Sequence, residues 1–304
     1  MAKTKPIIII GTGQIGSRHL QALKAVKFPL EIYVVDRSEE SLRIAKERYN
    51  AMPAGKIHHP IEYLRDLPKN KNYDIGIVAT TSGPRAALTK KLLSNARVRY
   101  LILEKLLFSE RNDYANIGRL IRAKKVKTWV NCPMRMMPFY KNLKKEFSNQ
   151  NITYVLHGNQ SGLATDLIHH LDYMAYLTGS KEFSLDTHLL DKKIKKSKRK
   201  GYLEITGTML AEFKNGSLGI FRCDAKESSL KTIEIINSRR RYLFKEDEGE
   251  AQVPYQSQLT TMLVEDLIET GKCELPAYEE STKLHLQMLE PIRKYFKFNN
   301  YPFT

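Results

Sequence analysis

The sequence predicts an α/β protein of two domains: a doubly wound parallel sheet over residues 1–130, and an α+β domain with a mostly antiparallel sheet over residues 131–304. Three observations predict this division. Apolar segments of strand length alternate with amphipathic helical segments in the first domain, which is the pattern of a parallel sheet. Several strand-like segments then follow one another without intervening helices, as in an antiparallel sheet. The chain has 304 residues, enough for two separate cores.

The first predicted strand runs directly into a glycine-rich turn. Ile7–Ile10 is a continuous β-branched run, typical of a strand buried on both faces of a parallel sheet. Gly11, Gly13 and Gly16 follow at the spacing G-x-G-x-x-G, and a helix is predicted from Gln14. In such a turn the first glycine permits the tight bend, the second lets a pyrophosphate approach the backbone, and the third lets the helix pack closely. Unpaired N–H groups at the helix start favour the same anion.

An acidic residue after the second predicted strand indicates which dinucleotide binds. The strand at 31–35 ends in Asp36, 20 residues after the last turn glycine, where a carboxylate accepts hydrogen bonds from an adenosine ribose. Asp36 favours NAD, because a 2′-phosphate would meet a carboxylate. Arg37 leaves NADP possible, because an adjacent arginine can receive that phosphate. We also expect Gln14 and Ile15, at the start of the helix, to contact the cofactor.

Two further strand-like runs end in polar residues. Thr80 and Thr81 follow one apolar run, and Glu104 and Lys105 follow the next. We predict that all four contact the cofactor, because the carboxyl ends of parallel strands form the ligand-binding edge of such a sheet. A lysine beside a positively charged nicotinamide would have a lowered pKa and could share in proton transfer. Lys105 is therefore also a candidate catalytic residue.

The other elements of the first domain continue the alternation of strands and helices. Predicted strands cover residues 31–35, 74–79, 100–103 and 128–130. Predicted helices cover residues 14–26, 39–49, 61–67, 84–95 and 113–124, and the third is a short helix ended by Pro68. Pro84 suits the first turn of its helix. The result is the βαβα order of a doubly wound sheet.

The pattern changes after Pro138. Helices are predicted at residues 138–147, 166–177, 256–270 and 279–298, and Gly179 follows the second of them. Strands are predicted at residues 152–157, 183–190, 202–213, 217–223, 230–236 and 240–244, with a hairpin turn at 214–216. Because most of these strands lack an intervening helix, the sheet should be mostly antiparallel.

Composition places the protein among ordinary globular chains, with 42% apolar and 27% charged residues. No apolar run is long enough to span a bilayer, and residues 1–11 lack the features of a signal peptide. Cys132, Cys223 and Cys273 are widely separated and have no metal-ligand spacing. We therefore predict a cytoplasmic protein without a metal site and without membrane association.

The net charge of +17 is concentrated in two segments, residues 192–200 and 239–241. One interpretation is a solvated loop and a strand end. Another is attraction of a phosphorylated or nucleotide-linked substrate. No nucleic-acid-binding motif accompanies the charge, so we predict no nucleic-acid partner.

Six segments, in order along nearly the whole chain, resemble the Gfo/Idh/MocA oxidoreductases. The segments are IIIIGTGQIGSRHLQAL, DIGIVATTSGPRAAL, LILEKLLF, NCPMRMMPFY, DLIHHLDYMAYLTG and LVEDLIETGKCELPAYEESTKLH. The resemblance implies an N-terminal Rossmann domain that binds NAD or NADP. It also implies a C-terminal sheet that often forms the oligomer interface, so we expect a homo-oligomer, a dimer or tetramer. The last two segments are similar to members that act in bacterial surface-polysaccharide pathways.

Two positions depart from the family pattern. Leu106 stands where the family has a proline after its lysine; proline restricts the residue before it and can favour a cis bond, so Lys105 could be placed differently. The family also has an Asp, a His four residues later, and an Asp three after that. Here His169 lies three residues before Asp172, as in the family, but only three residues after Asp166. His170 lies four residues after Asp166, as in the family, but only two residues before Asp172. Residues three and four apart share a helix face, so His169 is favoured and His170 is the alternative.

The resemblance implies an NAD(P)-dependent oxidoreductase that transfers a hydride to or from a hydroxyl or keto carbon of a sugar-like polyol or a nucleotide-linked sugar. His169 or His170 would take the hydroxyl proton, and Asp166 would orient the ring and raise its pKa. Lys105 would hold the same oxygen. Arg135, at an R-x-x-P spacing, would position the substrate or the second domain. The alternative is a catalytically inactive dinucleotide-binding regulatory or scaffolding protein, suggested by Leu106 and the altered Asp–His spacing.

Overall fold

The computed structural model describes residues 4–158, 162–224, 231–246, 248, 251, 254 and 256–304. The chain divides into two compact units. Unit 1 comprises residues 1–104, 112–131 and 254–278, and unit 2 comprises residues 105–111, 132–253 and 279–304. The division at 131/132 lies one residue from the predicted domain boundary at 130/131. Residues 105–111, predicted for the first domain, belong to unit 2. Residues 254–278, predicted for the second domain, belong to unit 1.

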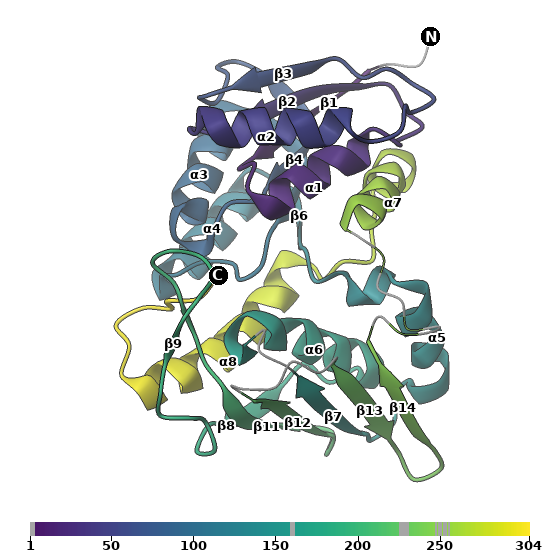
Figure 1. Cartoon of the computed structure of the whole chain (residues 1–304), viewed down its shortest axis with the longest axis vertical. Coiled ribbons are helices and arrows are strands. Elements are labelled where there is room, and N and C mark those ends of the chain that lie inside the picture. Colours follow the sequence, from purple (N-terminus) through teal and green to yellow (C-terminus); the bar gives the residue numbers. More distant parts are fainter. Residues whose placement is uncertain are drawn as a thin grey trace. The chain divides into compact units, whose positions relative to one another are not determined.

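Unit 1 contains a six-stranded sheet in the order β3-β2-β1-β4-β5-β6 (Figure 1). The strands are β1 Lys5–Ile10, β2 Leu30–Val35, β3 Ile61–Leu64, β4 Asn72–Val78, β5 Arg97–Leu103 and β6 Lys127–Val130. All neighbouring strands are parallel. The strand order switches sides at β1, which pairs with both β2 and β4, and ligands of open parallel sheets bind at the carboxyl ends next to such a switch.

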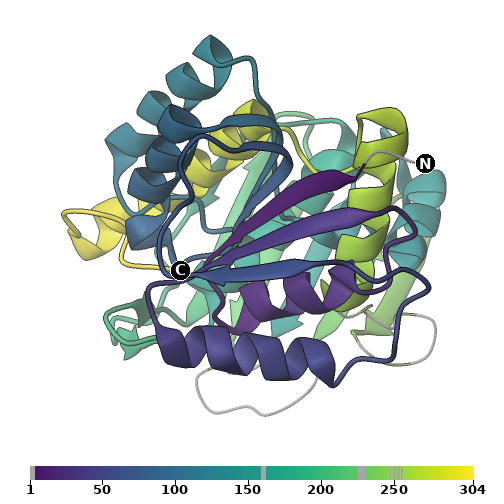
Figure 2. The same cartoon turned by 90° about the horizontal axis from the view of Figure 1, so that it is seen from above.

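Helices cover both faces of this sheet. They are α1 Gln14–Leu23, α2 Glu39–Asn50, α3 Ser82–Asn95, α4 Arg111–Ala123 and α7 Gln256–Thr270. Figures 1 and 2 show α1 and α2 on one face and α3 and α4 on the other. The predicted doubly wound parallel sheet is therefore confirmed. Helix α7, far along the chain, packs against α1.

One predicted helix is wrong. Residues 61–67 were expected to form a short helix, but Ile61–Leu64 is strand β3 and pairs in parallel with β2. The apolar side chains Ile61 and Tyr63 alternate with Glu62, which is the period of a strand. So short a segment gains little from helical hydrogen bonds, whereas the open edge of β2 offers a ladder of partners.

Unit 2 contains a second six-stranded sheet, in the order β14-β13-β7-β12-β11-β8. Its strands are β7 Thr153–Gly158, β8 Phe183–Asp186, β11 Gly207–Phe213, β12 Leu218–Cys223, β13 Thr232–Ile236 and β14 Arg241–Lys245. Only the β7–β12 pairing is parallel among these strands, so the predicted mostly antiparallel sheet is confirmed. The predicted strand 202–213 is divided: β10 Leu203–Glu204 pairs with β9 Lys195–Lys196 in a separate ribbon.

The helices of unit 2 are η1 Pro133–Met136, α5 Pro138–Phe147, α6 Leu163–Thr178 and α8 Tyr278–Phe296. Helix α6 packs against β12, and burial alternates along β7, β11, β12 and β13, so the sheet has one packed face and one half-exposed face. Gly179 ends α6 in the left-handed conformation, with φ of 74°, as its position after the predicted helix indicated. Within the described chain, no helix combines the length and apolar character needed to cross a membrane.

Candidate functional site

The three glycines of the first turn have distinct steric environments. Gly11 has φ of +90°, and a Cβ there would lie 2.7 Å from Thr80 Cγ2. A Cβ on Gly16 would lie 1.8 Å from the Gly11 carbonyl oxygen. A Cβ on Gly13 would meet no atom within 4 Å. Gly11 and Gly16 are thus required by the fold itself, whereas Gly13 leaves open space above the backbone, as a closely approaching pyrophosphate needs.

The start of α1 and the Asp36 carboxylate meet at this turn. Gly13 is the N-cap and supplies no side-chain hydrogen bond, so the first N–H groups of α1 are left without a side-chain cap. Gln14 is exposed and Ile15 is half-buried. Asp36 Oδ2 accepts hydrogen bonds from Thr12 N at 2.8 Å and Thr12 Oγ1 at 3.1 Å. The carboxylate predicted to bind ribose therefore also fixes the turn, and Arg37 beside it is exposed.

Thr80 and Thr81 lie directly after β4, at the carboxyl edge of the sheet. Thr81 is the N-cap of α3 and makes no side-chain cap hydrogen bond. Thr80 Oγ1 is buried and has no hydrogen-bond partner among the described residues. Since a buried hydroxyl without a partner is costly, this atom is a candidate to accept one from a ligand.

Glu104 is held by side chains of unit 1. Its Oε1 atom lies 2.9 Å from His19 Nε2 and accepts a hydrogen bond from Asn131 Nδ2 at 2.5 Å. The other ring nitrogen of His19 lies 2.7 Å from Thr260 Oγ1 on α7. Burial raises the pKa of Glu104, but the contacts with His19 and Asn131 outweigh burial and hold that pKa below its usual value. Glu104 thus links the edge of the sheet to α1 and α7.

Lys105, the next residue, is the first of unit 2. Its Nζ atom donates a hydrogen bond to the carbonyl oxygen of Thr165 at 2.8 Å. The peptide bond between Lys105 and Leu106 is cis. Thr165, rather than Asp166, lies four residues before His169. The lysine is therefore attached to the first turn of the helix that carries the candidate histidines.

A carboxylate on the neighbouring ribbon caps that first turn. Glu204 Oε1 accepts a hydrogen bond from Ala164 N at 2.7 Å, and Oε2 accepts one from the Thr165 hydroxyl at 2.6 Å. Gly162, the N-cap, has φ of +88°, and a Cβ there would lie 1.9 Å from Glu204 Cγ. Burial raises the pKa of Glu204 even though these donors oppose the shift. This cap starts α6 three residues before the predicted position.

The two adjacent histidines of α6 have different surroundings. His170 is 1% exposed, with Nδ1 at 2.8 Å from the Tyr154 hydroxyl and Nε2 at 3.4 Å from Asp166 Oδ2. His169 is half-buried, and its Nδ1 atom has no hydrogen-bond partner in the described chain. Burial lowers the pKa of His169 well below its usual value, and the positive charge of Lys105 lowers it further. Both effects favour the neutral imidazole, which is the form that can accept a proton.

Asp166 pairs with a lysine that the sequence did not indicate. Its Oδ2 atom lies 2.7 Å from Lys231 Nζ, and the same ammonium lies 3.1 Å from Glu246 Oε2. Burial raises the pKa of Asp166, but Lys231 and His170 reverse the shift and hold it well below its usual range. The negative charge of Asp166 raises the pKa of His169, as predicted, but the predicted net increase is wrong because burial and Lys105 outweigh it.

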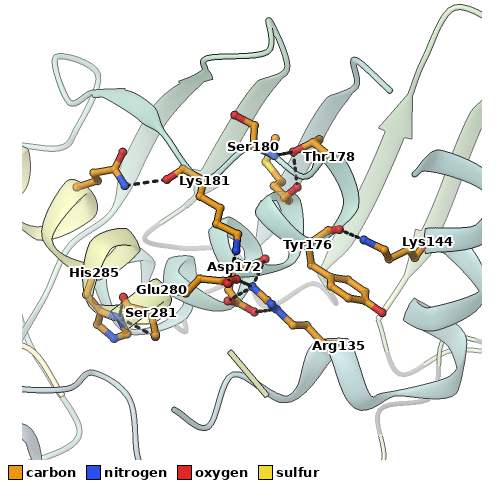
Figure 3. Close-up of polar contacts among 12 residues, drawn as sticks. Arg135, Lys144, Asp172, Tyr176, Thr178, Ser180, Lys181, Glu280, Ser281 and His285 are labelled. Atoms are coloured by element: carbon orange, nitrogen blue, oxygen red, sulfur yellow. Dashed lines mark hydrogen bonds and ion pairs between the residues drawn. The ribbon is translucent and has the colours of Figure 1, made fainter. Parts of the chain in front are cut away.

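Arg135 lies among carboxylates on the opposite half of α6 (Figure 3). It donates from Nε to Asp172 Oδ2 at 2.7 Å, and from Nη2 to Asp172 Oδ1 at 2.6 Å and to Glu280 Oε1 at 2.5 Å. Its guanidinium also lies over the Tyr176 ring, at 5.2 Å from the centroid. Arg135 is 7% exposed and Asp172 is fully buried, so this cluster fastens η1 to α6 and α8.

Sequence reasoning missed Thr165 and Lys231, which contact predicted site residues, and Glu204, which is bonded to Thr165. Thr165 could have been found from its position four residues before His169. Lys231 directly precedes β13 and Glu204 lies on β10, both remote in sequence, and nothing in their own segments indicates their partners. In the described part of the chain, no group of three or more His, Cys, Asp and Glu side chains is placed to hold a metal ion.

A doubly wound parallel sheet whose first strand runs into a glycine turn, with an acidic residue after the second strand, is typical of dinucleotide-binding proteins. Residues 5–132 match the Gfo/Idh/MocA family, described as an oxidoreductase family with an NAD-binding Rossmann fold. Over these residues the resemblance found in the sequence is confirmed, because they match the NAD-binding Rossmann domain of that family. No protein of curated function matches the sequence.

Solved structures extend the likeness in fold to nearly the whole chain. GenD2 from gentamicin A biosynthesis, in complex with NAD, superposes with a TM-score of 0.74 at 13% identity, covering 98% of this chain and 95% of GenD2. Lactobacillus casei scyllo-inositol dehydrogenase, with NAD(H) and scyllo-inositol, gives a TM-score of 0.69 at 16% identity, covering 96% and 98%. L. casei myo-inositol dehydrogenase, with NAD(H) and myo-inositol, gives 0.69 at 15% identity, covering 96% and 95%.

Proposed function

We propose that this protein is an NAD-dependent oxidoreductase that acts on a hydroxyl or keto carbon of a sugar-like polyol or a nucleotide-linked sugar. The observation that carries the proposal is that the Lys105 ammonium is bonded to the first turn of the helix that also carries half-buried His169, whose Nδ1 atom has no partner among the described residues. These are the two groups that proton transfer at a hydroxyl oxygen requires. The inositol substrates named for two of the solved structures support a polyol as substrate.

The cofactor site fits NAD on the evidence of the turn. The open space at Gly13 and the first N–H groups of α1 suit a pyrophosphate. Asp36 supports a ribose 2′-hydroxyl over a 2′-phosphate, although exposed Arg37 leaves NADP open. Bound NAD would supply the hydride acceptor or donor at its nicotinamide ring. Thr80 and Thr81 would contact it at the sheet edge, and Glu104 would position that edge through His19.

His169 would take the proton from the substrate hydroxyl during oxidation and return it during reduction. Its lowered pKa favours the neutral imidazole, which accepts the proton. Lys105, attached to Thr165 O, would hold and polarise the substrate oxygen. Asp166 would stabilise the positive charge that His169 acquires, because its carboxylate already favours that charge. We propose that Arg135 acts by positioning α6 through Asp172, rather than by binding substrate directly.

The half-exposed face of the unit 2 sheet supports a homo-oligomer. Pairing places Leu243, Val155, Ile220 and Leu210 in one cross-strand row, with Glu234 between the first two. Leu243 is 61% exposed. We propose that a second copy covers this row in a dimer or tetramer, and sedimentation equilibrium of the full chain tests this. No disulfide joins Cys132, Cys223 and Cys273 in the described part of the chain, which supports a cytoplasmic location. A role in polysaccharide biosynthesis is a further proposal.

Turnover tests the catalytic assignment. We expect His169→Ala and Lys105→Met each to lower NAD-dependent turnover of a polyol or keto-sugar panel by about two or more orders of magnitude, the usual size of a general acid–base contribution. His188→Ala and Lys90→Met, at exposed positions, are the matched controls and should keep wild-type turnover. Near-normal turnover in both site variants would contradict this mechanism.

Two glycine variants test the cofactor site against the fold. Gly13→Ala adds a methyl group where the turn is open, so it should leave the thermal midpoint unchanged and weaken NAD binding at least roughly tenfold. Gly16→Ala places a methyl group against the Gly11 carbonyl and should lower the thermal midpoint as well. Unchanged NAD affinity in Gly13→Ala would contradict the assignment of the pyrophosphate to this turn.

One observation favours the inactive alternative. Asp166 is bonded to Lys231 and His170, and the Nδ1 atom of His169 lacks an orienting partner among the described residues. A dinucleotide-binding scaffold would bind NAD(H) tightly yet show no hydride transfer to any member of the polyol and keto-sugar panel. That result, in protein with a normal thermal midpoint, would favour the scaffold over the enzyme.

A further inference from the structure

The most concentrated positive charge in the chain lies beside the helix that carries His169. Residues 192–200 read KKIKKSKRK and contain seven Lys and Arg side chains in nine positions. Strands β9 and β10 and the turn between them include most of this segment, and we call residues 192–204 the basic arm. Five of its cations, Lys192, Lys193, Lys196, Lys198 and Lys200, are exposed and form no ion pair with any acidic side chain of the described chain.

The basic arm is a fastened element rather than a free loop. Ser197 N donates to the Tyr202 carbonyl at 2.9 Å across the turn. Leu203 N donates to the Pro302 carbonyl at 2.7 Å, and Arg199 Nη1 donates to the Thr304 carbonyl at 2.9 Å. Like charges are therefore held close together on an ordered ribbon. Such repulsion costs free energy, which an anionic ligand would offset.

The base of the arm is connected to the proposed catalytic lysine by direct contacts. Lys195 pairs with Glu204 in the ribbon. Glu204 accepts the hydrogen bond of the Thr165 hydroxyl at 2.6 Å, and Lys105 donates to the carbonyl of the same threonine at 2.8 Å. The chain of contacts from Lys105 to Lys195 thus passes through two residues, Thr165 and Glu204, all within unit 2.

We propose that the basic arm binds a phosphoryl group carried by the substrate, so that the polyol or sugar oxidised at His169 is a phosphorylated or nucleotide-linked one. The proposal rests on the proposed function for the location of the reacting carbon. Lys195 and Lys196 lie on β9 beside Glu204, and Lys198 and Lys200 lie in the turn at the other end of the ribbon, so the cations continue away from the Glu204 end. The arm can therefore contact phosphate groups that lie away from the reacting sugar, while His169 and Lys105 remain at the reacting end.

Binding measurements test the arm separately from turnover. The full chain, saturated with NAD(H), is titrated by calorimetry with UDP, with glucose 6-phosphate and with uncharged myo-inositol. The arm variant is Lys196→Gln/Lys198→Gln/Lys200→Gln, whose side chains are exposed and leave the backbone contacts in place. The control variant is Arg97→Gln/Arg99→Gln/Lys124→Gln, which removes the same charge from a basic hollow in unit 1.

We expect wild type and the control variant to bind UDP or glucose 6-phosphate with affinities within about twofold of each other. The arm variant should bind at least roughly tenfold more weakly. This difference in affinity should become smaller as the salt concentration rises. Preference for UDP identifies a nucleotide-linked sugar, and preference for glucose 6-phosphate a sugar monophosphate. No binding to wild type, equal binding to wild type and arm variant, or equal losses in both variants would overturn the proposal. The proposed function fails separately, through loss of NAD(H) binding or of turnover on every substrate.

Discussion

The two halves of helix α6 each carry an aspartate, and the pKa values of the two are shifted in opposite directions. Asp166, in the first turn, is raised in pKa by burial, but Lys231 and His170 bring that pKa well below its usual range. Asp172, in the second half, is raised to a pKa of about 6 by burial, although Arg135 opposes the shift. The Asp166 side chain is 20% exposed and that of Asp172 is 1% exposed. Asp166 therefore belongs to a partly exposed cluster at one end of α6, and Asp172 belongs to a more deeply buried cluster at the other end.

The difference separates residues that hold the helix from residues that can meet a ligand. Arg135 has two carboxylate partners and a ring beneath it, so little of its bonding capacity is left for a substrate. His169 has a buried nitrogen without a described partner and lies near a lysine that is half-buried. A charged residue in a motif is thus a weak guide to catalysis until its partners are known.

Removing Arg135 should give the largest effect on stability. Arg135→Ala leaves Asp172 and Glu280 without their shared cation, and breaking a buried ion pair in this way costs about 3–5 kcal/mol of unfolding free energy. Urea denaturation measures it. Because the folded pKa of Asp172 lies above its ordinary value of 3.8, folding favours the protonated form, and stability falls as pH rises through about 6. The loss in Arg135→Ala should therefore be larger at neutral pH than near pH 5.

Two controls separate this effect from a general loss of charge. Arg43→Ala removes an arginine that bridges two glutamates on the exposed face of α2, and it should hardly move the denaturation midpoint. Asp172→Asn in the Arg135→Ala background removes the stranded carboxylate and should recover part of the stability. Equal losses at both pH values, with no recovery, would contradict a buried ion-pair role.

Neutralising Asp166 should have a smaller effect, and on activity rather than on folding alone. Asp166→Asn removes the charge that stabilises protonated His169, so we expect turnover to fall about tenfold, equivalent to about 1.4 kcal/mol in the barrier. Steady-state kinetics measure the effect. Lys231→Met should lower stability but leave Asp166 free to act on His169. A loss of a hundredfold or more in Asp166→Asn would instead make Asp166 a direct participant in proton transfer.

The fold and the cofactor turn were largely predictable, because both are determined by local rules. Gly11 and Gly16 leave no room for a Cβ, and such steric limits appear in the sequence as fixed glycine spacing. The buried strands are continuous apolar runs. The failure at residues 61–67 has the opposite cause: β3 is half-buried at the sheet edge, and its pairing with β2 decided its structure.

The candidate site was less predictable, because it is assembled from distant segments. Lys105, Asp166 and His169 could be named from a resemblance and a helical spacing, but the partners that set their charges could not. Lys231, just before β13, and Glu204, on β10, lie in segments without a motif, and they reach α6 only through the tertiary fold. The roles of Arg135 and Asp172 depended on the same missing contacts.

The smallest effect concerns the pKa of His169, and it tests the functional half of α6 most directly. Burial lowers that pKa first, Lys105 lowers it further, and Asp166 raises it. Lys105→Met should therefore shift the His169 titration toward its ordinary value of about 6.5, and Asp166→Asn should shift it further down. Histidine NMR of the full chain, labelled at the ring, measures both shifts without requiring turnover, and exposed His188 serves as the internal reference. Opposite shifts in the two variants would mean that Lys105 lowers the pKa of His169 and that Asp166 raises it. Shifts of the same sign, or none, would show that neither charge governs His169, and the low pKa would then arise from burial alone.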